Sequence, residues 1–403
     1  MKPDITLVFP RSQFLLNEIM FPPLGIMYLS AFLKQHGMKV QCLDMALGHT
    51  PDMAEADIIG LSFTTPQRDE AFKLAKHYKE QGKYVIAGGP HPTHMPDECR
   101  EHGIDCVIAG YGEVSLFNKI GEVQGTDIAI LADIDIDDFP YPDRDCLPIS
   151  KYYQEIGGIP ATPIIASRGC PFRCSYCSKV SQKFSIQSAK RTLDEIEYVN
   201  SKYGYTAFSI YDDTIAVDKV RLFEMAEALK DKGYKFRCFC RADLLNDIHV
   251  CRDLAKMGVV DVGIGIESGS DYILKKNMKG STVDVNTQSI INLREVGVGS
   301  KAFLIVGLPG ESEETVKDTA KWIETAQPDD IGVSMFQPLP GSDIFNNPEK
   351  YDIDFKYNGN PMWYRGTPGE YKPMTRTKDL STDRIIELRD QLEGDYKKKE
   401  LLQ

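Results

Sequence analysis

The amino-acid sequence predicts an α/β protein with two successive parts. A doubly wound parallel sheet comes first, and a partial β/α barrel with a short C-terminal extension follows it. Short β-branched runs alternate with amphipathic stretches over residues 1–132, and again on a longer scale over residues 160–345. A chain of 403 residues has room for two or three domains. Strands that alternate with helices form parallel sheets with right-handed crossovers.

The first part, residues 1–132, contains four expected strands, in the segments DITLVFP, KVQCLDM, DIIGLSFT and YVIAGG. The stretch GIMYLSAFLKQHG between the first two is expected to be a helix. Its apolar residues Ile26, Leu29 and Leu33 recur at helical spacing, and Gly37 follows as a C-terminal cap would.

Residues 133–159 read as an acidic, proline-rich linker. The barrel part, residues 160–345, has six expected strands in the segments TPIIAS, AFSIYDD, FRCFCR, VDVGIGIE, KAFLIVG and IGVSMF. Six strand–helix units in about 185 residues predict most of a β/α barrel, which stays open because no further pair closes it.

The extension, residues 346–403, is rich in aromatic residues and ends in an expected helix. Two interpretations of its aromatic segment stand side by side: a satellite core that covers the open side of the barrel, or a lid that closes over substrate. The aromatic residues are Phe355, Tyr357, Trp363, Tyr364 and Tyr371, and the apolar face of the helix carries Ile385, Leu388, Leu392 and Tyr396.

Lysine and arginine number 47 against 59 aspartates and glutamates, and the net charge of −12 disfavours a nucleic-acid partner. The 10 cysteines are too few for a disulfide scaffold, so we expect reduced thiols. No apolar run approaches the roughly 18 residues of a membrane span, and the first residues lack the apolar stretch of a secretory signal. The expected location is the cytoplasm.

Three cysteines, Cys170, Cys174 and Cys177, lie close together directly after an apolar strand. Thiolates at this spacing repel one another unless a cation holds them. A structural zinc ion takes four protein ligands, and iron–sulfur clusters usually take four cysteines. Three thiolates therefore predict a cluster with one iron open to a small molecule. Zinc with a distant fourth ligand and three unrelated surface cysteines are the alternatives.

The segment CPFRCSYC at 170–177 resembles the Cys-x-x-x-Cys-x-x-Cys motif of the radical S-adenosylmethionine (SAM) superfamily, including the aromatic before the last cysteine. The resemblance implies that the three cysteines bind a [4Fe-4S] cluster and that SAM chelates its open iron. It also implies that the backbone at Tyr176 touches adenine. A reductant such as flavodoxin or ferredoxin would drive SAM cleavage to methionine and a 5′-deoxyadenosyl radical.

Later strand ends offer further ligands by the same resemblance. Asp212 and Asp213 stand where the superfamily often has Gly-Gly-Glu for the methionine amino group, and a helix cap is the equal alternative because the glycines are absent. Glu267, followed by Ser268, ends the fourth strand and is expected to accept bonds from the ribose hydroxyls, with a solvated carboxylate as the alternative. Arg241 ends the third strand, at the barrel edge that holds substrates and cofactors.

Small residues also gather at two strand ends of the first part: Ser62, Thr64 and Thr65 after one strand, and Gly88 with Gly89 after the next. Such residues let a flat ligand approach the edge of a sheet. Together with FPPLG at 21–25, these segments resemble the cobalamin-binding domains that are fused to radical SAM barrels. The resemblance implies bound cobalamin, and a flavodoxin-like domain without a ligand is the alternative.

One feature of that family is missing. An Asp-x-His-x-x-Gly segment after the first strand often supplies a histidine to the lower face of cobalt, whereas this chain has RSQFLLN at 11–17. Bound cobalamin is therefore expected to be base-off, without a lower histidine. Arg68 is a candidate neighbour of the lower face, where a protonated guanidinium cannot ligate cobalt; alternatively, Arg68 begins a solvated helix.

Together the resemblances imply a cobalamin-dependent radical SAM methyltransferase that acts on an unactivated carbon, or less favourably phosphorus, of a small-molecule or peptide substrate. In that chemistry the 5′-deoxyadenosyl radical removes a hydrogen atom, and the substrate radical takes a methyl group from methylcobalamin. A cyclase, oxidase or rearrangement enzyme with the same cofactors is one alternative. A non-catalytic iron–sulfur or corrinoid carrier is the alternative from another class.

Overall fold

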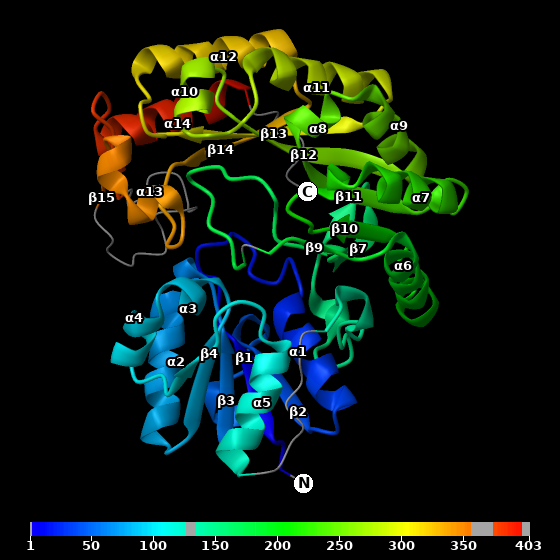
Figure 1. Ribbon diagram of the computed structural model, residues 1–403, viewed down its shortest axis with the longest axis vertical. Coiled ribbons are helices and arrows are strands. Elements are labelled where there is room, and N and C mark those ends of the chain that lie inside the picture. Colours follow the sequence, from blue (N-terminus) through cyan, green and yellow to red (C-terminus); the bar gives the residue numbers. More distant parts are fainter. Residues whose placement is uncertain (1, 126–133, 182, 356–373, 397–403) are drawn as a thin grey trace. The chain divides into compact units, whose positions relative to one another are not determined.

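The computed structural model of the chain describes residues 2–125, 134–181, 183–355 and 374–396. Two compact units divide the chain, one built mainly from residues 1–154 and the other mainly from 155–403. Each unit has its own parallel sheet with helices packed on it (Figure 1). The predicted fold class, a doubly wound domain followed by a partial barrel, is confirmed.

The first unit contains a five-stranded, all-parallel sheet in the order β2-β1-β3-β4-β5. The chain leaves β1 toward β2 on one side and returns to place β3 on the other side. This reversal is a topological switch point, and ligands of doubly wound sheets bind at the carboxyl edge there. The loops after β1 and β3 meet at that edge. The strands are β1 (Ile5–Phe9), β2 (Val40–Asp44), β3 (Ile58–Ser62), β4 (Tyr84–Gly88) and β5 (Cys106–Val107).

The strands of this sheet are almost entirely buried, because helices cover both of its faces. The four strands that the sequence predicts are present; β5, only two residues long, is additional. The helices are α1 (Leu24–Gln35), α2 (Arg68–Glu80), α3 (Pro90–His94), α4 (Pro96–Glu101) and α5 (Glu113–Gln124).

The acidic segment expected to be a linker is ordered where the structure describes it, and it packs on the first unit. Asp143 accepts hydrogen bonds from Ser30 and Lys34 of α1, each at 2.6 Å. The hydroxyl of Tyr152 donates to the buried Asp44 at the end of β2, also at 2.6 Å. Side-chain contacts therefore hold residues 143–152 against α1 and β2.

The second unit contains a seven-stranded sheet in the order β14-β13-β12-β11-β10-β7-β6. Six of these strands are parallel and match the six predicted segments, and only β6 runs antiparallel at the edge. The sheet curls but does not close, because β14 and β6 are its two free edges (Figure 1). The strands are β6 (Glu155–Ile156), β7 (Ile159–Ile164), β10 (Ala207–Ile210), β11 (Lys235–Arg241), β12 (Val259–Glu267), β13 (Gly299–Val306) and β14 (Asp330–Met335).

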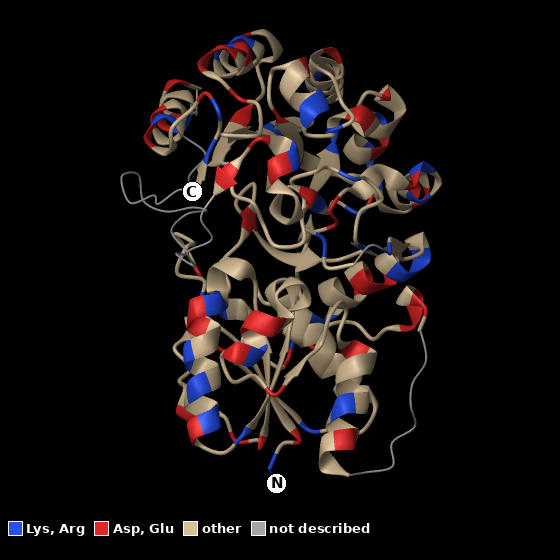
Figure 2. Cartoon of the chain, turned by 60° about the vertical axis from the view of Figure 1, so that its left-hand side comes forward, with Lys and Arg blue, Asp and Glu red and all other residues tan. Residues whose placement is uncertain are grey.

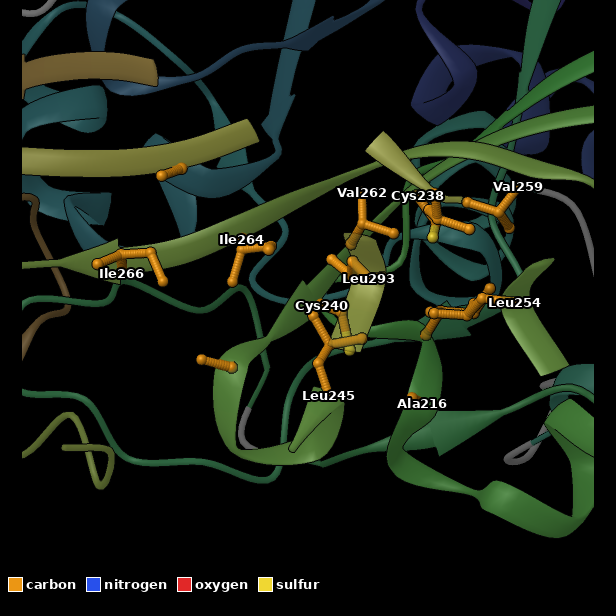
Figure 3. Packing of buried hydrophobic residues seen from close by; sticks show 14 of the residues in the cluster. Ala216, Cys238, Cys240, Leu245, Leu254, Val259, Val262, Ile264, Ile266 and Leu293 are labelled. Atoms are coloured by element: carbon orange, nitrogen blue, oxygen red, sulfur yellow. The ribbon is translucent and has the colours of Figure 1, made fainter. Parts of the chain in front are cut away.

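Helices cover the convex face of this curled sheet, and alternate strand residues form the core between them. Cys238 and Cys240 of β11 point into this core beside Val262 and Ile264 of β12 (Figure 3). Both thiols are therefore core residues. The helices are α6 (Ala189–Tyr203), α7 (Lys219–Leu229), α8 (Ala242–Leu245), α9 (Ile248–Met257), α10 (Asp271–Lys276), α11 (Val283–Glu295), α12 (Glu313–Ala326), α13 (Asp343–Asn346) and α14 (Thr382–Tyr396).

The terminal helix α14 belongs to the barrel core. Ile385, Leu388 and Leu392, on the apolar face that the sequence predicts, are buried against β13 and β14. A short hairpin of β15 (Asp354–Phe355) and β16 (Thr375–Arg376) precedes the helix, and the ring of Phe355 lies 5.5 Å from that of Phe345. The other four predicted aromatic residues, Tyr357, Trp363, Tyr364 and Tyr371, lie outside the described residues.

Charged side chains of both signs are interspersed over the outer helices of each unit, and the strands are largely free of them (Figure 2). Among the described helices, none combines the length and the apolar character that crossing a bilayer requires.

Candidate functional site

The three cysteines lie on a loop whose two ends are joined. β8 (Ser167–Arg168) precedes the loop and pairs antiparallel with β9 (Ser185–Ile186) after it. Cys170 and Cys174 are partly buried, and Cys177 is exposed. None of the three forms a disulfide, and no histidine stands between them in the sequence. This donor set, three thiols on one loop, fits an iron–sulfur cluster that leaves one iron open.

The middle of this loop is anchored to the rest of the unit. The amide and the hydroxyl of Ser175 both donate to the carbonyl of Asn277, at 3.2 and 3.0 Å. The Ser175 carbonyl accepts from the amide of Ile344 at 3.1 Å. In the part of the chain that the structure describes, no three His, Cys, Asp or Glu side chains converge closely enough to hold a metal ion. The anchored backbone thus fixes the position of the loop. The three thiols are not close enough together in this structure to form a metal site.

Tyr176 contributes to the anchor through its ring. The ring packs against a hydrophobic cluster that includes Ile273, Leu308, Phe336 and Ile344. Burial raises the pKa of its hydroxyl well above the usual value, and the nearby Glu267 carboxylate adds to this effect. Because the side chain faces the protein interior, the predicted contact with adenine would fall to the Tyr176 backbone, as the resemblance implies.

Arg241, at the end of β11, lies beside the cluster loop. Its Nη1 lies 3.3 Å from the sulfur of Cys174, and its guanidinium stacks 3.9 Å from the ring centre of Phe172. The guanidinium also donates to Asp243 at 2.8 Å and to the carbonyl of Lys279 at 2.6 Å. A cation at this position stabilises the negative charge that a ligating thiolate carries.

Glu267, at the end of β12, is the predicted ribose ligand. It is buried and adopts a left-handed backbone conformation with φ of 67°. Non-glycine residues in this region are strained and gather at functional sites. Oε1 accepts a hydrogen bond from Nζ of Lys279 at 2.8 Å, whereas Oε2 has no hydrogen bond among the described contacts. One carboxylate oxygen thus remains for a ligand hydroxyl.

Gly265 and Ser268 show how tightly the surroundings of Glu267 are packed. A β-carbon at position 265 would lie 2.5 Å from Oε1 of Glu267 and 2.8 Å from Nζ of Lys279. Glycine is therefore required beside the carboxylate. Ser268, predicted as a neighbouring contact, is fully buried, and its hydroxyl lies 3.3 Å from that of Thr319 on α12. Ser268 therefore contacts the helix layer.

Asp212 and Asp213 differ sharply in environment. Asp212 is buried, and its Oδ1 accepts from the amides of Ala166 and Ser167 at 2.7 and 2.9 Å, while Asp213 is exposed. Burial raises the pKa of Asp212, against the lowering effect of Arg221. Oδ2 of Asp212 is buried without a hydrogen bond among the described contacts. Asp212 therefore fixes the chain that enters the cluster loop and keeps one acceptor oxygen.

The alternative that either aspartate caps the next helix is wrong. The side chain of Asp218 caps α7 by accepting from the amide of Arg221 at 3.0 Å.

In the first unit, the hydroxyl of Ser62 lies in a cradle of glycines. β-Carbons at positions 89 and 25 would lie 3.4 and 3.9 Å from its Oγ. A β-carbon at position 88 would meet only the carbonyl of Ile108, at 3.7 Å. Gly88 and Ser62 are paired at the carboxyl ends of β4 and β3. This open edge fits the approach of a flat ligand such as cobalamin.

Gly89 has a different role from Gly88. Its φ is +99°, and a β-carbon there would lie 2.9 Å from the carbonyl oxygen of Phe63. Any side chain would be strained and would clash with backbone, so Gly89 shapes the turn itself.

The threonines of the loop after β3 bond within the first unit. The Thr64 hydroxyl donates to Gln67 at 2.9 Å, and the Thr65 hydroxyl lies 3.2 Å from Nδ1 of His91. Gln67, which the sequence did not single out, donates to the Pro10 carbonyl and the Ser12 hydroxyl, each at 2.9 Å. It therefore joins the loop after β1 to the loop after β3 at the switch point.

Arg68 begins α2, but its side chain is buried. The alternative that Arg68 is only a solvated residue at the start of a helix is therefore wrong. Nε of Arg68 lies 3.4 Å from Asp69 and 3.5 Å from Glu98 of α4. His91 is fully buried in the same cluster, with Nε2 3.4 Å from Glu98. Burial lowers the pKa of His91, although Glu98 opposes the shift. The guanidinium is thus held by carboxylates of the helix layer.

Family comparison identifies both units. Residues 164–323 match the model of the radical SAM superfamily, and residues 19–117 match that of the B12 binding domain. The chain is a radical SAM protein with a B12-binding domain. The radical SAM match runs from the end of β7 into α12, and the B12-binding match includes the Ser62 and Gly88 edge. The two domains imply a [4Fe-4S] cluster, SAM and cobalamin as cofactors, and an enzyme.

Relatives and solved structures of this radical SAM protein agree with the assignment. An uncharacterized methyltransferase of Pyrococcus horikoshii is 26% identical over 95% of this chain and 90% of its own length. An anaerobic magnesium-protoporphyrin IX monomethyl ester cyclase of Rubrivivax gelatinosus is 28% identical over 84% of this chain and 69% of its own. The radical SAM methyltransferase TsrM of Kitasatospora setae, solved with cobalamin and a [4Fe-4S] cluster, superposes with a TM-score of 0.69 at 16% identity, covering 97% and 85% of the two chains.

Proposed function

We propose that this protein is a cobalamin-dependent radical SAM methyltransferase that methylates an unactivated carbon, or less favourably phosphorus, of a small molecule or peptide. One observation carries the proposal. The chain combines a three-thiol loop beside a buried Glu267–Lys279 pair with a separate sheet edge that is open at Gly88. When bound, the cluster and SAM supply a hydrogen-abstracting radical, and cobalamin supplies the methyl group.

The residues of the second unit would hold and orient SAM. Cys170, Cys174 and Cys177 would ligate the cluster, and the free oxygen of Glu267 would accept a ribose hydroxyl. The buried Oδ2 of Asp212 is an acceptor of the kind that the methionine ammonium group needs. Arg241 would stabilise the negative charge of the Cys174 thiolate.

The residues of the first unit would bind cobalamin in the base-off form. Gly88 leaves the sheet edge open, and Ser62 offers a hydroxyl without a competing hydrogen bond among the described residues. No histidine lies in the loop after β1, at residues 10–22. His91, the nearest in sequence to the Gly-Gly turn, is committed to Thr65 and Glu98. A lower histidine ligand is therefore not part of the proposal.

The proposal also includes the cellular setting. All 10 cysteines are free thiols, as in the reducing cytoplasm. Flavodoxin or ferredoxin would supply the electron. Nucleic acid is not proposed as a partner, because the net charge is −12.

The test is anaerobic reconstitution followed by product analysis. Methyl transfer by this route consumes two SAM molecules, so 5′-deoxyadenosine and S-adenosylhomocysteine should form in equal amounts. A cyclase, oxidase or rearrangement enzyme with the same cofactors is the second candidate, because the cyclase relative matches 84% of this chain. That candidate predicts 5′-deoxyadenosine alone, and a non-catalytic carrier predicts neither product.

A further inference from the structure

The concave face of the curled sheet carries three aromatic rings in a row. Along β11 to β14, one set of alternate residues packs into the helix-facing core (Figure 3), and the opposite set is only partly buried. Tyr211, directly after β10, Phe239 of β11 and Phe303 of β13 belong to this opposite set and are each partly exposed. We call these three residues the aromatic row.

The rings of the aromatic row are close to parallel. The ring centres of Tyr211 and Phe239 are 5.8 Å apart with planes inclined by 25°, and those of Phe239 and Phe303 are 6.1 Å apart with planes inclined by 32°. Three adjacent, partly exposed rings give the concave face an aromatic surface. Offset stacking on such a surface is favourable for another aromatic ring.

Glycines on the neighbouring strands make room for this arrangement. A β-carbon at Gly263 of β12 would lie 2.7 Å from both Phe239 and Phe303. A β-carbon at Gly332 of β14 would lie 3.2 Å from Phe303. Any larger residue at 263 would push both rings out of the row, so the glycines allow the rings to lie across the sheet.

The charges beside the aromatic row are already neutralised. Arg237 donates to Asp261 at 2.7 and 2.9 Å, and Lys301 donates to Asp330 at 2.5 Å. Arg237 precedes Phe239 by two residues on β11, and Lys301 precedes Phe303 by two residues on β13. Because each of these two cations is already paired with a carboxylate, this surface favours an uncharged ligand over an anion.

The aromatic row is also continuous with the SAM site. Phe239 precedes Arg241 by two residues on the same face of β11, which corresponds to about 7 Å along a strand. Gly263 stands in the same relation to Gly265, the residue that touches Glu267 and Lys279. A ligand on the aromatic row would therefore lie next to the nucleotide site.

We propose that the aromatic row binds the substrate of this enzyme through a planar, uncharged ring system that stacks on Phe239 and Phe303. The inference rests on the proposed function for there being a substrate radical at all. It adds the chemical class of the substrate: a conjugated, flat and neutral ring rather than a charged metabolite or a flexible aliphatic chain.

The experiment measures binding by calorimetry on the full chain, anaerobically, reconstituted with cluster and cobalamin and saturated with SAM. The probes are naphthalenemethanol, its fully saturated decalin counterpart, and naphthoate. We expect the flat alcohol to bind about tenfold more tightly than the saturated alcohol, because only the aromatic ring can stack. Naphthoate should bind more weakly than the alcohol, because Arg237 and Lys301, the cations described beside the row, are already paired with carboxylates.

Variants assign the binding to the row. Phe303→Leu should weaken naphthalenemethanol about fivefold or more, whereas Phe303→Tyr, which keeps the ring, should not. Phe223→Leu, at an exposed position on α7, is the matched control and should change nothing. SAM affinity should be equal in all four proteins.

Three results would overturn the inference: equal binding of the flat and saturated alcohols, unchanged binding in Phe303→Leu, or binding of the flat alcohol only when SAM is left out. The last would assign the rings to adenine. Failure of the proposed function would look different, because the protein would retain no corrinoid or would make no S-adenosylhomocysteine, while the probe affinities would still be measurable.

Discussion

Replacement of Lys279 by methionine tests the buried ion pair at the end of β12. Methionine keeps an unbranched apolar stem and removes only the ammonium group. The side chains of Lys279 and Glu267 are 5% and 11% exposed, and Nζ lies 2.8 Å from Oε1. The substitution therefore leaves the Glu267 carboxylate buried without its counter-ion.

The magnitude follows from leaving a buried carboxylate without its counter-ion. Removing one partner of a buried ion pair costs about 3 to 5 kcal/mol. We therefore expect Lys279→Met to lower the free energy of unfolding by about 3 to 4 kcal/mol at pH 7.

The assay is urea unfolding of the full chain and equilibrium dialysis of SAM, both at pH 7. Lys276→Met is the matched control. Lys276 pairs with Asp352 at 3.5 Å, but the Asp352 side chain is 73% exposed, so the expected loss is below about 1 kcal/mol. SAM should bind at least about tenfold more weakly to Lys279→Met, since the Glu267 carboxylate loses the ammonium group that orients it, and equally well to Lys276→Met. A loss in Lys279→Met below about 1 kcal/mol would refute the reasoning.

Three further substitutions test other parts of the molecule. Cys174→Ala should abolish the cluster, because three thiols leave no spare ligand; normal iron and sulfide content would contradict the assignment. Gly88→Leu should abolish retention of hydroxocobalamin without unfolding the protein, because a β-carbon there makes only an ordinary contact, with the Ile108 carbonyl at 3.7 Å; retained corrinoid after desalting would remove Gly88 from the site. Burial raises the pKa of Glu311 to about 8, opposed by the amides of Gly307 and Leu308. The folded state thus keeps a proton that the unfolded state has lost, and stability should fall by about 1.4 kcal/mol per pH unit from roughly pH 5 to 8. In Glu311→Gln that slope should vanish in urea unfolding, and an unchanged slope would show that another group causes it.

The sequence predicted the sheets well, because strand periodicity is a local signal. Apolar alternation was sufficient for all six parallel strands of the barrel. The cluster ligands that the thiol spacing predicts stay a prediction. β5 and β6 were missed, since two residues are too few to show a period. The apolar face of α14 was predicted, but its place in the barrel core depends on long-range packing that no local pattern records.

The site residues that the sequence missed are those defined by pairing across loops. Lys279 and Asn277 lie in the segment KKNMKG, which reads as an ordinary polar turn. Their roles arise only when the fold brings Glu267 and Ser175 against them. Asn277 also donates to the Pro309 carbonyl at 3.1 Å, so it ties the cluster loop to the loop after β13.

Arg241 shows why the cluster loop and the nucleotide site should respond together. One guanidinium contacts the sulfur of Cys174, the ring of Phe172 and the backbone carbonyl of Lys279. The carbonyl belongs to the residue whose ammonium holds Glu267. A shift of the cluster loop therefore reaches the proposed ribose acceptor through two side chains, and a change at the acceptor returns by the same route. Because both links are short and largely buried, the two parts of the site cannot be displaced independently without breaking a hydrogen bond in a region where water does not replace it.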